Sequence, residues 1–392
     1  MKDNSQYGNL GVSSDKKGVH KAIRTLDKGL FEGAFCRIFP DNLTGDVDYC
    51  LIAHADGVGT KASLGYLYWK VTGDISALAN LAIDAIVMNL DDMICVGATG
   101  PFTFTQNIDR NSFTIPDEII EAIIVKTNEV FIDLKKRHGI DITYSGGETA
   151  DVNDLVRTLT LNASMQARMR RKDVIRTNIL PGDVIVGLAS FGKARYEQEY
   201  NSGIGSNGLT LARHSVFHPS YRELYPESYE EALGDKAYRG QYYVDGKLSI
   251  KPRATVGKLV LSPTRTYAPI VKAILSTVPR ESIHAMIHCS GGGQTKCMGF
   301  GKKVHIVKDT LFPVPPVFSI IQDQSNETWQ NMYKTFNMGH RFELYCDEST
   351  AAKIVAISKS FGVDAQIIGR VHSAANTCLT IRSVHGEFFY KK

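Results

Sequence analysis

The sequence predicts a globular protein of two domains in which strands and helices are mixed, on three observations. The chain has 392 residues, enough for two hydrophobic cores, and 43% of them are hydrophobic. Strand-like and helix-like apolar periods alternate through its first half. A basic connector from Arg168 to Gly182 then interrupts the pattern, and a new apolar strand follows. We therefore expect domains at residues 1–175 and 176–392.

Four elements are predicted in the first half. An apolar and aromatic strand covers residues 49–53 and runs into a glycine turn. A largely buried helix follows at residues 74–96. A second helix begins at a proline and ends at a glycine, over residues 116–139. Residues 140–145 then form a strand that ends at a glycine pair.

The second half is less regular. Strands are predicted at residues 184–189 and 283–289, with a helix at 267–275. Residues 193–257 are rich in Tyr, Glu, Arg and Gly and have weak periodicity. We expect extended loops or insertions there.

Composition and charge argue against several classes of function. The formal charge of +4 is small for this length, and the short run from Arg168 to Lys172 is typical of a solvated linker, so no nucleic-acid partner is expected. None of the seven cysteines forms a C-x-x-C pair, which favours reduced, buried thiols. The N-terminus lacks the apolar core of a signal peptide, and no stretch approaches the roughly 18 apolar residues of a membrane span. We expect a cytoplasmic protein without a membrane partner.

The stretch AHADGVGTKA ends a strand with an acid, two glycines and a lysine, and four interpretations of it compete. A P-loop fails, because it needs a glycine directly before the lysine and Thr60 stands there. A dinucleotide fingerprint matches formally, but Asp56 would repel a pyrophosphate unless a metal ion lay between them. A metal-bridged phosphate site places Asp56 on the cation, and Lys61 with backbone amides on the phosphates. A structural turn without a ligand is the fourth interpretation.

Acidic residues elsewhere favour the metal-bridged interpretation. Asp84, Asp91 and Asp92 lie in an otherwise apolar helix, with Asp84 and Asp91 on one face and Asp92 toward its edge. Unpaired buried carboxylates are costly, so these acids are partnered by Lys or Arg, exposed on a solvated strip, or held by a cation. Glu148, just beyond the glycine pair, is presented in the same way. Mg²⁺ takes oxygen ligands from a few carboxylates and leaves positions for substrate phosphates, so the pattern indicates a nucleotide site.

Motifs in both halves resemble, in order and spacing, the phosphoribosylformylglycinamidine cyclo-ligase (aminoimidazole ribonucleotide synthetase) family. Its superfamily includes selenophosphate synthetase, thiamine-monophosphate kinase and HypE. The matching stretches are DGVGTK, IDAIVMNLDDMICVGA, GGETAD, SNGLTLAR, LSPTRTYAPIV, IHAMIHCSGGG and MYKTFNMG. The resemblance runs from about Tyr7 to Gly369 and covers most of the chain.

The resemblance implies an ATP-dependent ring closure in purine biosynthesis. Formylglycinamidine ribonucleotide and ATP would give aminoimidazole ribonucleotide, ADP and phosphate. An amide oxygen is a poor leaving group, so the γ-phosphoryl group is transferred to the formamide oxygen before the amidine nitrogen attacks. The implied cofactors are ATP and Mg²⁺.

The resemblance also assigns roles by position. The implied metal ligands are Asp56, Asp92 and Glu148, with Asp84 and Asp91 as supporting or alternative ligands. The implied phosphate-binding residues are Gly57, Gly59, Thr60, Lys61, Gly146 and Gly147. The substrate's own phosphate is expected at Ser206, Asn207 and Gly208 or at Gly291, Gly292 and Gly293. The implied catalytic residues are Lys61 and Asp92, together with His54 and His288 as proton carriers; each histidine could instead be a hydrogen-bonded structural residue.

The fold implied by the resemblance is α+β, with a roughly four-stranded sheet and helices in each domain. The N-terminal sheets of two chains would pair in a homodimer, with active sites near the interface. The chain departs from the family at Gly205, where a histidine commonly precedes the SNG motif, and in segments 193–203 and 215–257, which resemble insertions.

Two other functions compete with this one. Another ATP-dependent kinase or synthetase of the same superfamily would share the acidic site and differ in the second domain. A regulatory homologue would bind nucleotide without turning it over.

Overall fold

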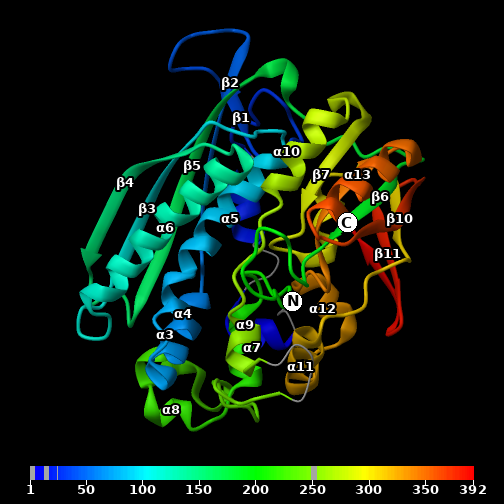
Figure 1. The fold of residues 1–392 in the computed structure, drawn as a ribbon. Helices are drawn as coiled ribbons and strands as arrows, with labels where there is room; N and C mark the ends of the chain where they lie inside the picture. The colour runs from blue at the N-terminus through cyan, green and yellow to red at the C-terminus, as the bar shows by residue number, and fades with distance from the viewer. Residues whose placement is uncertain (1–4, 13–16, 24, 249–253) are drawn as a thin grey trace.

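Two β-sheets, one from each half of the chain, organise the structure (Figure 1). The computed structural model describes residues 5–12, 17–23, 25–248 and 254–392. The first sheet takes its strands from residues 38–170 and the second from residues 184–391. The predicted α+β class with two sheet-containing domains is confirmed. The two sheets have five and seven strands, more than the expected four or so in each.

The first sheet has the strand order β1-β2-β5-β3-β4. Neighbouring strands are antiparallel except β3 and β4, which are parallel. Helix α6 connects those two strands, because parallel neighbours require a crossover. The strands are β1 (Ile38–Pro40), β2 (Tyr49–Gly57), β3 (Phe102–Arg110), β4 (Ile142–Asp151) and β5 (Leu159–Arg170).

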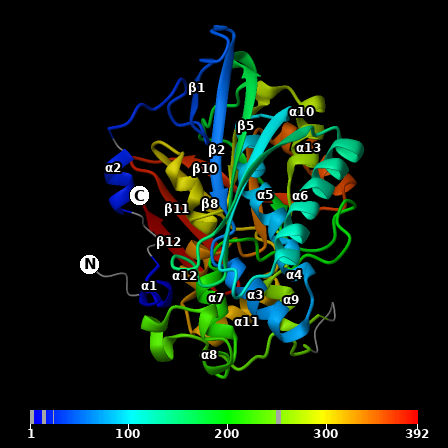
Figure 2. The same cartoon turned by 90° about the vertical axis from the view of Figure 1, so that its left-hand side faces the viewer.

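Helices cover one face of this sheet (Figure 2). Every second residue of β5, from Leu159 to Ala167, is buried beneath them. The residues between are polar and half-buried or exposed, and they define the open face of the sheet. The helices of this half are α3 (Lys61–Thr72), α4 (Ser76–Ala79), α5 (Leu81–Ile94) and α6 (Asp117–His138).

The helix predictions for the first half are confirmed with one difference. Pro116 caps α6, and Gly139 ends it with a left-handed φ of 62°. The stretch expected as one helix over residues 74–96 forms two, α4 and α5, which meet at Asn80. The three acids predicted on this stretch, Asp84, Asp91 and Asp92, all lie on α5.

Two strands continue through the glycines that were expected to end them. β2 extends to Gly57, and β4 includes both glycines of its pair and Glu148. The pairing of β3 with β4 shifts register between Phe104 and Gln106. A Cβ on Gly147 would stand 1.7 Å from the carbonyl oxygen of Gln106. Glycine is required there because two backbones approach closely, not because the chain turns.

The second sheet has the order β12-β11-β8-β10-β6-β9-β7 and is antiparallel except for β11 with β8. The predicted strand at residues 184–189 matches β6, and the strand and helix near residues 283 and 267 match β7 and α10. The strands are β6 (Val184–Ala189), β7 (Ile283–His288), β8 (Val304–Lys308), β9 (His340–Cys346), β10 (Ala365–Ser373), β11 (Cys378–Ser383) and β12 (Gly386–Lys391).

Helices of the second half pack on this sheet and against the first half. α13 lies on β6 and β10, and α10 contacts both α13 and α5. Helix α5 also contacts β7, so it lies between the two halves (Figure 1). The helices are α7 (Leu209–Val216), α8 (Tyr221–Leu224), α9 (Val256–Val260), α10 (Ala268–Thr277), α11 (Pro316–Ser325), α12 (Trp329–Thr335) and α13 (Glu348–Ser360).

Residues 193–257, where extended loops or insertions were expected, consist mostly of turns and short helices, apart from 249–253, which lie outside the described residues. The segment is nevertheless packed, since Tyr221, Tyr238 and Val244 are buried. The N-terminal helix α1 (Gln6–Asn9) lies against α7 (Figure 2). Among the described residues, no helix is both long and apolar enough to cross a membrane.

Candidate functional site

Lys61 begins α3, directly after the GVGT turn, and its ammonium group points into the protein. Its Nζ donates to Asp84 Oδ1 at 2.7 Å and to the backbone oxygens of Ser262 at 2.7 Å and Gly205 at 3.2 Å. Only 1% of the side chain is exposed. Burial lowers the pKa of Lys61, and the charge of Asp84 opposes that shift. Three acceptors satisfy the three donors of an ammonium group, so the expected contact with phosphate is not formed.

Asp84 lies at the centre of a link between the two halves of the chain. Besides Lys61, it accepts hydrogen bonds from Ser206 Oγ at 2.9 Å and from both the backbone N–H and the hydroxyl of Thr264. Such a set of donors replaces the cation that the sequence suggested. Asp84 is therefore a partnered buried acid, one of the three alternatives that the sequence left open.

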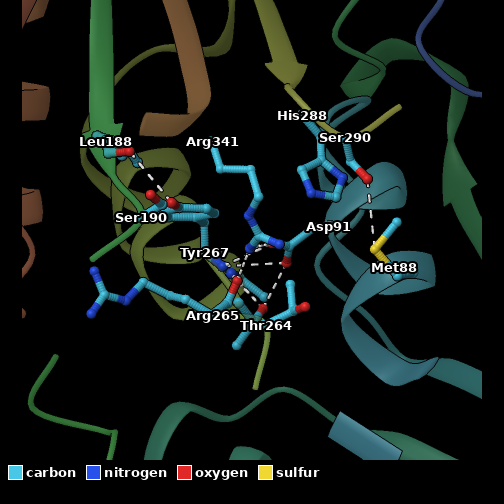
Figure 3. Close-up of polar contacts among 12 residues, drawn as sticks. Met88, Asp91, Leu188, Ser190, Thr264, Arg265, Tyr267, His288, Ser290 and Arg341 are labelled. Atoms are coloured by element: carbon cyan, nitrogen blue, oxygen red, sulfur yellow. Dashed lines mark hydrogen bonds and ion pairs between the residues drawn. The ribbon is translucent and has the colours of Figure 1, made fainter. Parts of the chain in front are cut away.

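Asp91 has the same kind of surroundings, which Figure 3 shows. Its carboxylate accepts from Thr266 Oγ1 at 2.7 Å and from the Tyr267 backbone N–H at 3.2 Å. The guanidinium of Arg341 lies 3.5 Å away. Burial raises the pKa of Asp91, and nearby cations, Arg341 among them, oppose the shift. Asp91 is thus also a partnered buried acid, because protein donors contact its carboxylate.

Asp92 joins two histidines from different halves of the chain. Its Oδ2 lies 3.1 Å from His54 Nε2 on β2, and its Oδ1 lies 2.6 Å from His288 Nδ1 on β7. His54 also contacts Asn89 Oδ1 through Nδ1 at 3.0 Å. His288 Nε2 is buried and has no partner among the described residues. The structure thus brings together three residues predicted as catalytic: His54, Asp92 and His288.

Proton affinities in this group are shifted by the contacts. Burial lowers the pKa of His54, but the hydrogen bond and charge of Asp92 outweigh it and leave that pKa raised. Burial raises the pKa of Asp92, and its two imidazole partners hold it well below the usual range instead. Asp92 is therefore ionised, and His54 keeps a proton to higher pH than a free histidine does.

Asp56 lies two residues beyond His54 on the same face of β2. It is exposed, and its Oδ1 accepts from the Gly57 backbone N–H at 2.7 Å. The surrounding protein raises the pKa of Asp56, and the negative charge of Asp92 raises it further. Two carboxylates that repel each other, one on β2 and one on α5, are a suitable pair for a shared cation.

Glu148 does not join them. It pairs across the sheet in a row with Asn107, Asn162 and Gly57, whereas Asp56 is in the adjacent row. Adjacent rows project to opposite faces, so Glu148 lies on the open face and Asp56 on the helix-covered face. Three strand spacings also separate the two, about 14 Å. The expected convergence of Asp56, Asp92 and Glu148 on one ion is therefore wrong within a single chain.

The two loops expected to bind the substrate lie side by side. Asn207 Nδ2 donates to Ser290 Oγ at 2.5 Å, and a Cβ on Gly291 would lie 3.8 Å from Asn207 Oδ1. Thr60 Oγ1 and Thr210 Oγ1, 2.9 Å apart, connect this region to the GVGT turn. The predicted phosphate and substrate loops of the first and second halves are thus neighbours, although Gly146 and Gly147 lie within β4.

Several glycines in these loops have a positive φ or leave no room for a Cβ atom. Gly208 precedes α7 with φ +75°, and a Cβ there would be 2.2 Å from the ring of Phe336. Gly293, with φ +49°, would bring a Cβ within 2.5 Å of the Phe336 carbonyl oxygen. Gly205 has φ +72°, a conformation that glycine adopts freely and that other residues adopt uncommonly. The departure from the family at Gly205 therefore accompanies a loop conformation suited to glycine.

Sequence reasoning missed the residues that partner the buried acids. Arg341 lies 250 positions from Asp91, and its Nη1 is buried without a partner among the described residues. The partners from residues 262–267 belong to the SPTRTY motif, part of the stretch LSPTRTYAPIV that carries the family resemblance. That motif is the one signal that could have predicted them.

A second buried polar cluster lies in the second sheet. Ligand atoms of Cys289, His340 and Glu343 lie within 4.8 Å of one another. The ammonium of Lys308, however, binds the Glu343 carboxylate and also donates to Gln294. The cation that this cluster holds is therefore lysine, and its arrangement is that of a buried ion pair.

Fold and site together define a two-domain α+β protein with carboxylates, histidines and glycine loops gathered between its halves. The chain belongs to the AIR synthase related protein family, since residues 39–169 match the N-terminal domain of that family and residues 181–381 match the C-terminal domain.

Curated relatives carry the name phosphoribosylformylglycinamidine cyclo-ligase. The protein of that name from Methanocaldococcus jannaschii is 32% identical over 83% of this chain and 79% of its own length. The one from Methanococcus vannielii is 30% identical over 83% of this chain and 78% of its own length.

Solved structures resemble the fold. A chain of the HypE-HypF complex superposes with a TM-score of 0.57 at 15% identity, over 96% of this chain and 99% of the other. Phosphoribosylformylglycinamidine synthase II from Thermotoga maritima gives 0.54 at 13% identity, over 98% of this chain and 50% of the other.

Proposed function

We propose that this chain is the ATP-dependent cyclo-ligase EC 6.3.3.1, which converts formylglycinamidine ribonucleotide to aminoimidazole ribonucleotide in purine biosynthesis. The observation that carries the proposal is the meeting of His54, Asp56, Asp92 and His288 beside the glycine loops of both halves. Membership of the family and the names of relatives at about 30% identity support the choice of reaction.

The reaction requires a leaving group at the formamide carbon. ATP donates its γ-phosphoryl group to the formamide oxygen, the amidine nitrogen attacks the same carbon, and phosphate departs with the former formamide oxygen. The turns at Gly57–Thr60 and Ser206–Gly208 offer backbone N–H groups that can orient phosphates. His54, whose pKa is raised, carries a proton beside the reacting groups, and Asp92 fixes the orientation of both imidazoles.

Asp56 and Asp92 are the residues that would hold Mg²⁺. The charge of Asp92 raises the pKa of Asp56, and a cation would relieve that repulsion; each Asp92 oxygen also keeps a lone pair beyond its histidine contact. Bound Mg²⁺ neutralises charge on the transferred phosphoryl group.

We also propose that the chain acts as a homodimer in which the first domain, residues 1–175, provides both the ATP site and the dimer contact. The open face of the first sheet carries the polar residues of β5 and, on β4, Glu148, which has no ion-pair partner among the described residues. Packing of two such faces would bring Glu148 to the interface, where its carboxylate is available to a site formed across the dimer. The second domain, residues 176–392, would hold the substrate's phosphate.

A coupled assay tests the proposal. Purified protein is mixed with ATP, Mg²⁺ and formylglycinamidine ribonucleotide, and ADP release is followed with and without the substrate. We expect release that depends on the substrate, a loss of at least tenfold in Asp92→Asn, and normal rates in the matched exposed variant Asp133→Asn.

Three outcomes would contradict parts of this account. ADP release at the same rate with and without formylglycinamidine ribonucleotide indicates another kinase or synthetase of the superfamily. If no ADP is released but ATP still raises the melting temperature, the chain is a regulatory homologue. Unchanged turnover in Asp92→Asn removes Asp92 from the catalytic group.

A further inference from the structure

A pocket outside the candidate site lies between the segment that precedes β1 and the connector between the two sheets. Its volume is about 320 Å³, and it is lined by Leu30, Phe31, Arg171, Lys172 and Arg176. Three of these residues belong to or follow the basic run that was expected to be a solvated linker. None of them takes part in the site built on Asp92.

The charges in this pocket are not balanced. Three cationic side chains line it, and no carboxylate does. Among the described residues, none of the three forms an ion pair: Arg171 Nε donates to the Tyr49 backbone oxygen at 2.8 Å, and Arg176 lies over the ring of Phe31 at 4.8 Å. Arg168 of the same connector, by contrast, forms an ion pair with Asp41. Like charges around one concavity repel each other, and a bound anion relieves that repulsion.

The remaining lining residues narrow the class of anion. Leu30 and Phe31 form an apolar side that suits a base or a sugar, while arginine and lysine suit phosphate oxygens. The volume lies at the small end of the range of about 300–1,000 Å³ for ligand pockets, which fits a mononucleotide and not a macromolecule.

We propose that this pocket is a second phosphate-binding site of the protein, which takes a nucleoside monophosphate and is separate from the proposed ATP site. Arg176 and Lys172 bind the phosphate, and Leu30 and Phe31 contact the nucleoside. This proposal does not require the chain to be catalytically active.

Isothermal titration calorimetry with adenosine 5′-monophosphate, inorganic phosphate and adenosine tests it. A saturating non-hydrolysable ATP analogue with Mg²⁺ is present throughout, so that the proposed ATP site does not contribute. We expect adenosine 5′-monophosphate to bind and adenosine not to bind, because the phosphate provides the charge. The double variant Lys172→Ala/Arg176→Ala should weaken binding at least tenfold.

Arg170→Ala is the matched control. Arg170 belongs to the same basic run but contacts the Tyr49 hydroxyl and does not line the pocket. Arg170→Ala should change the affinity for adenosine 5′-monophosphate less than twofold. All variants should have the melting temperature of the wild type, since these side chains are half-buried or exposed. Inorganic phosphate that binds as tightly as the nucleotide would support the phosphate site and contradict the nucleoside contact. Equal binding to wild type and double variant, or no binding to wild type, would overturn the proposal, whatever the turnover assay shows.

Discussion

Replacement of Lys61 by methionine separates a structural role for this lysine from a role in phosphate binding. The variant keeps most of the apolar volume of the side chain but leaves the Asp84 carboxylate buried without its cation. It also removes the donor to the backbone oxygens of Gly205 and Ser262. Removal of one partner of a buried ion pair costs about 3–5 kcal/mol in the free energy of unfolding.

That cost converts to a measurable change in melting temperature. With about 2.1 cal/mol/K per residue over 392 residues, the entropy of unfolding is about 0.8 kcal/mol/K. The melting temperature of Lys61→Met should therefore fall by about 4–6 °C in differential scanning calorimetry. The double variant Lys61→Met/Asp84→Asn should lose less than Lys61→Met alone, because the uncompensated charge is gone.

Lys70→Met is the control, since Lys70 is an exposed lysine on the same helix, and its melting temperature should change by less than about 1 °C. If Lys61→Met has the melting temperature of the wild type, Lys61 does not stabilise the fold through its ion pair with Asp84. If that variant also raises the KM for ATP at least tenfold, Lys61 contacts phosphate after all.

Further predictions concern His54 and Gly208. The pKa of His54 is raised in the folded state, so its pairing with Asp92 stabilises the protein fully below the unfolded pKa of about 6.5 and is lost as the pH rises through the folded value. The difference in melting temperature between wild type and His54→Asn should shrink as the pH is raised from about 6 to about 9, and a difference that grows would contradict the pairing. Gly208→Ala should cost at least about 2 kcal/mol in urea unfolding, because a left-handed alanine also collides with Phe336. Gly59→Ala, also left-handed but with open space around the new Cβ, should cost only about 1 kcal/mol; equal losses would exclude the collision.

The sequence predicted those features that depend on neighbouring residues. Helix α6 follows from a proline at its start, a glycine at its end and an apolar stripe between them, all local signals. The two-sheet fold was expected from the motifs that carry the family resemblance, which also named His54, Asp92 and His288 as candidate catalytic residues but did not predict that the three contact one another. The structure confirms the two-sheet fold.

Features that depend on pairing between distant segments were not predictable. The sequence shows three buried acids on α5 but not which cation each one meets, because Lys61 is 23 positions and Arg341 250 positions away from its partner. The face on which Glu148 lies depends on the register shift between β3 and β4, and a shift of one residue exchanges the two faces of a strand. A glycine pair that permits close strand packing has the same local sequence as one that forms a turn.

The central claim is that the formamide oxygen is phosphorylated before the ring closes. It is tested most directly with formylglycinamidine ribonucleotide that carries ¹⁸O in its formyl group, turned over by this protein with unlabelled ATP and Mg²⁺. Mass spectrometry of the phosphate released should show one ¹⁸O atom per molecule, in amounts equal to the ADP and aminoimidazole ribonucleotide formed. Unlabelled phosphate would mean that the oxygen leaves by another route and would contradict the proposed mechanism.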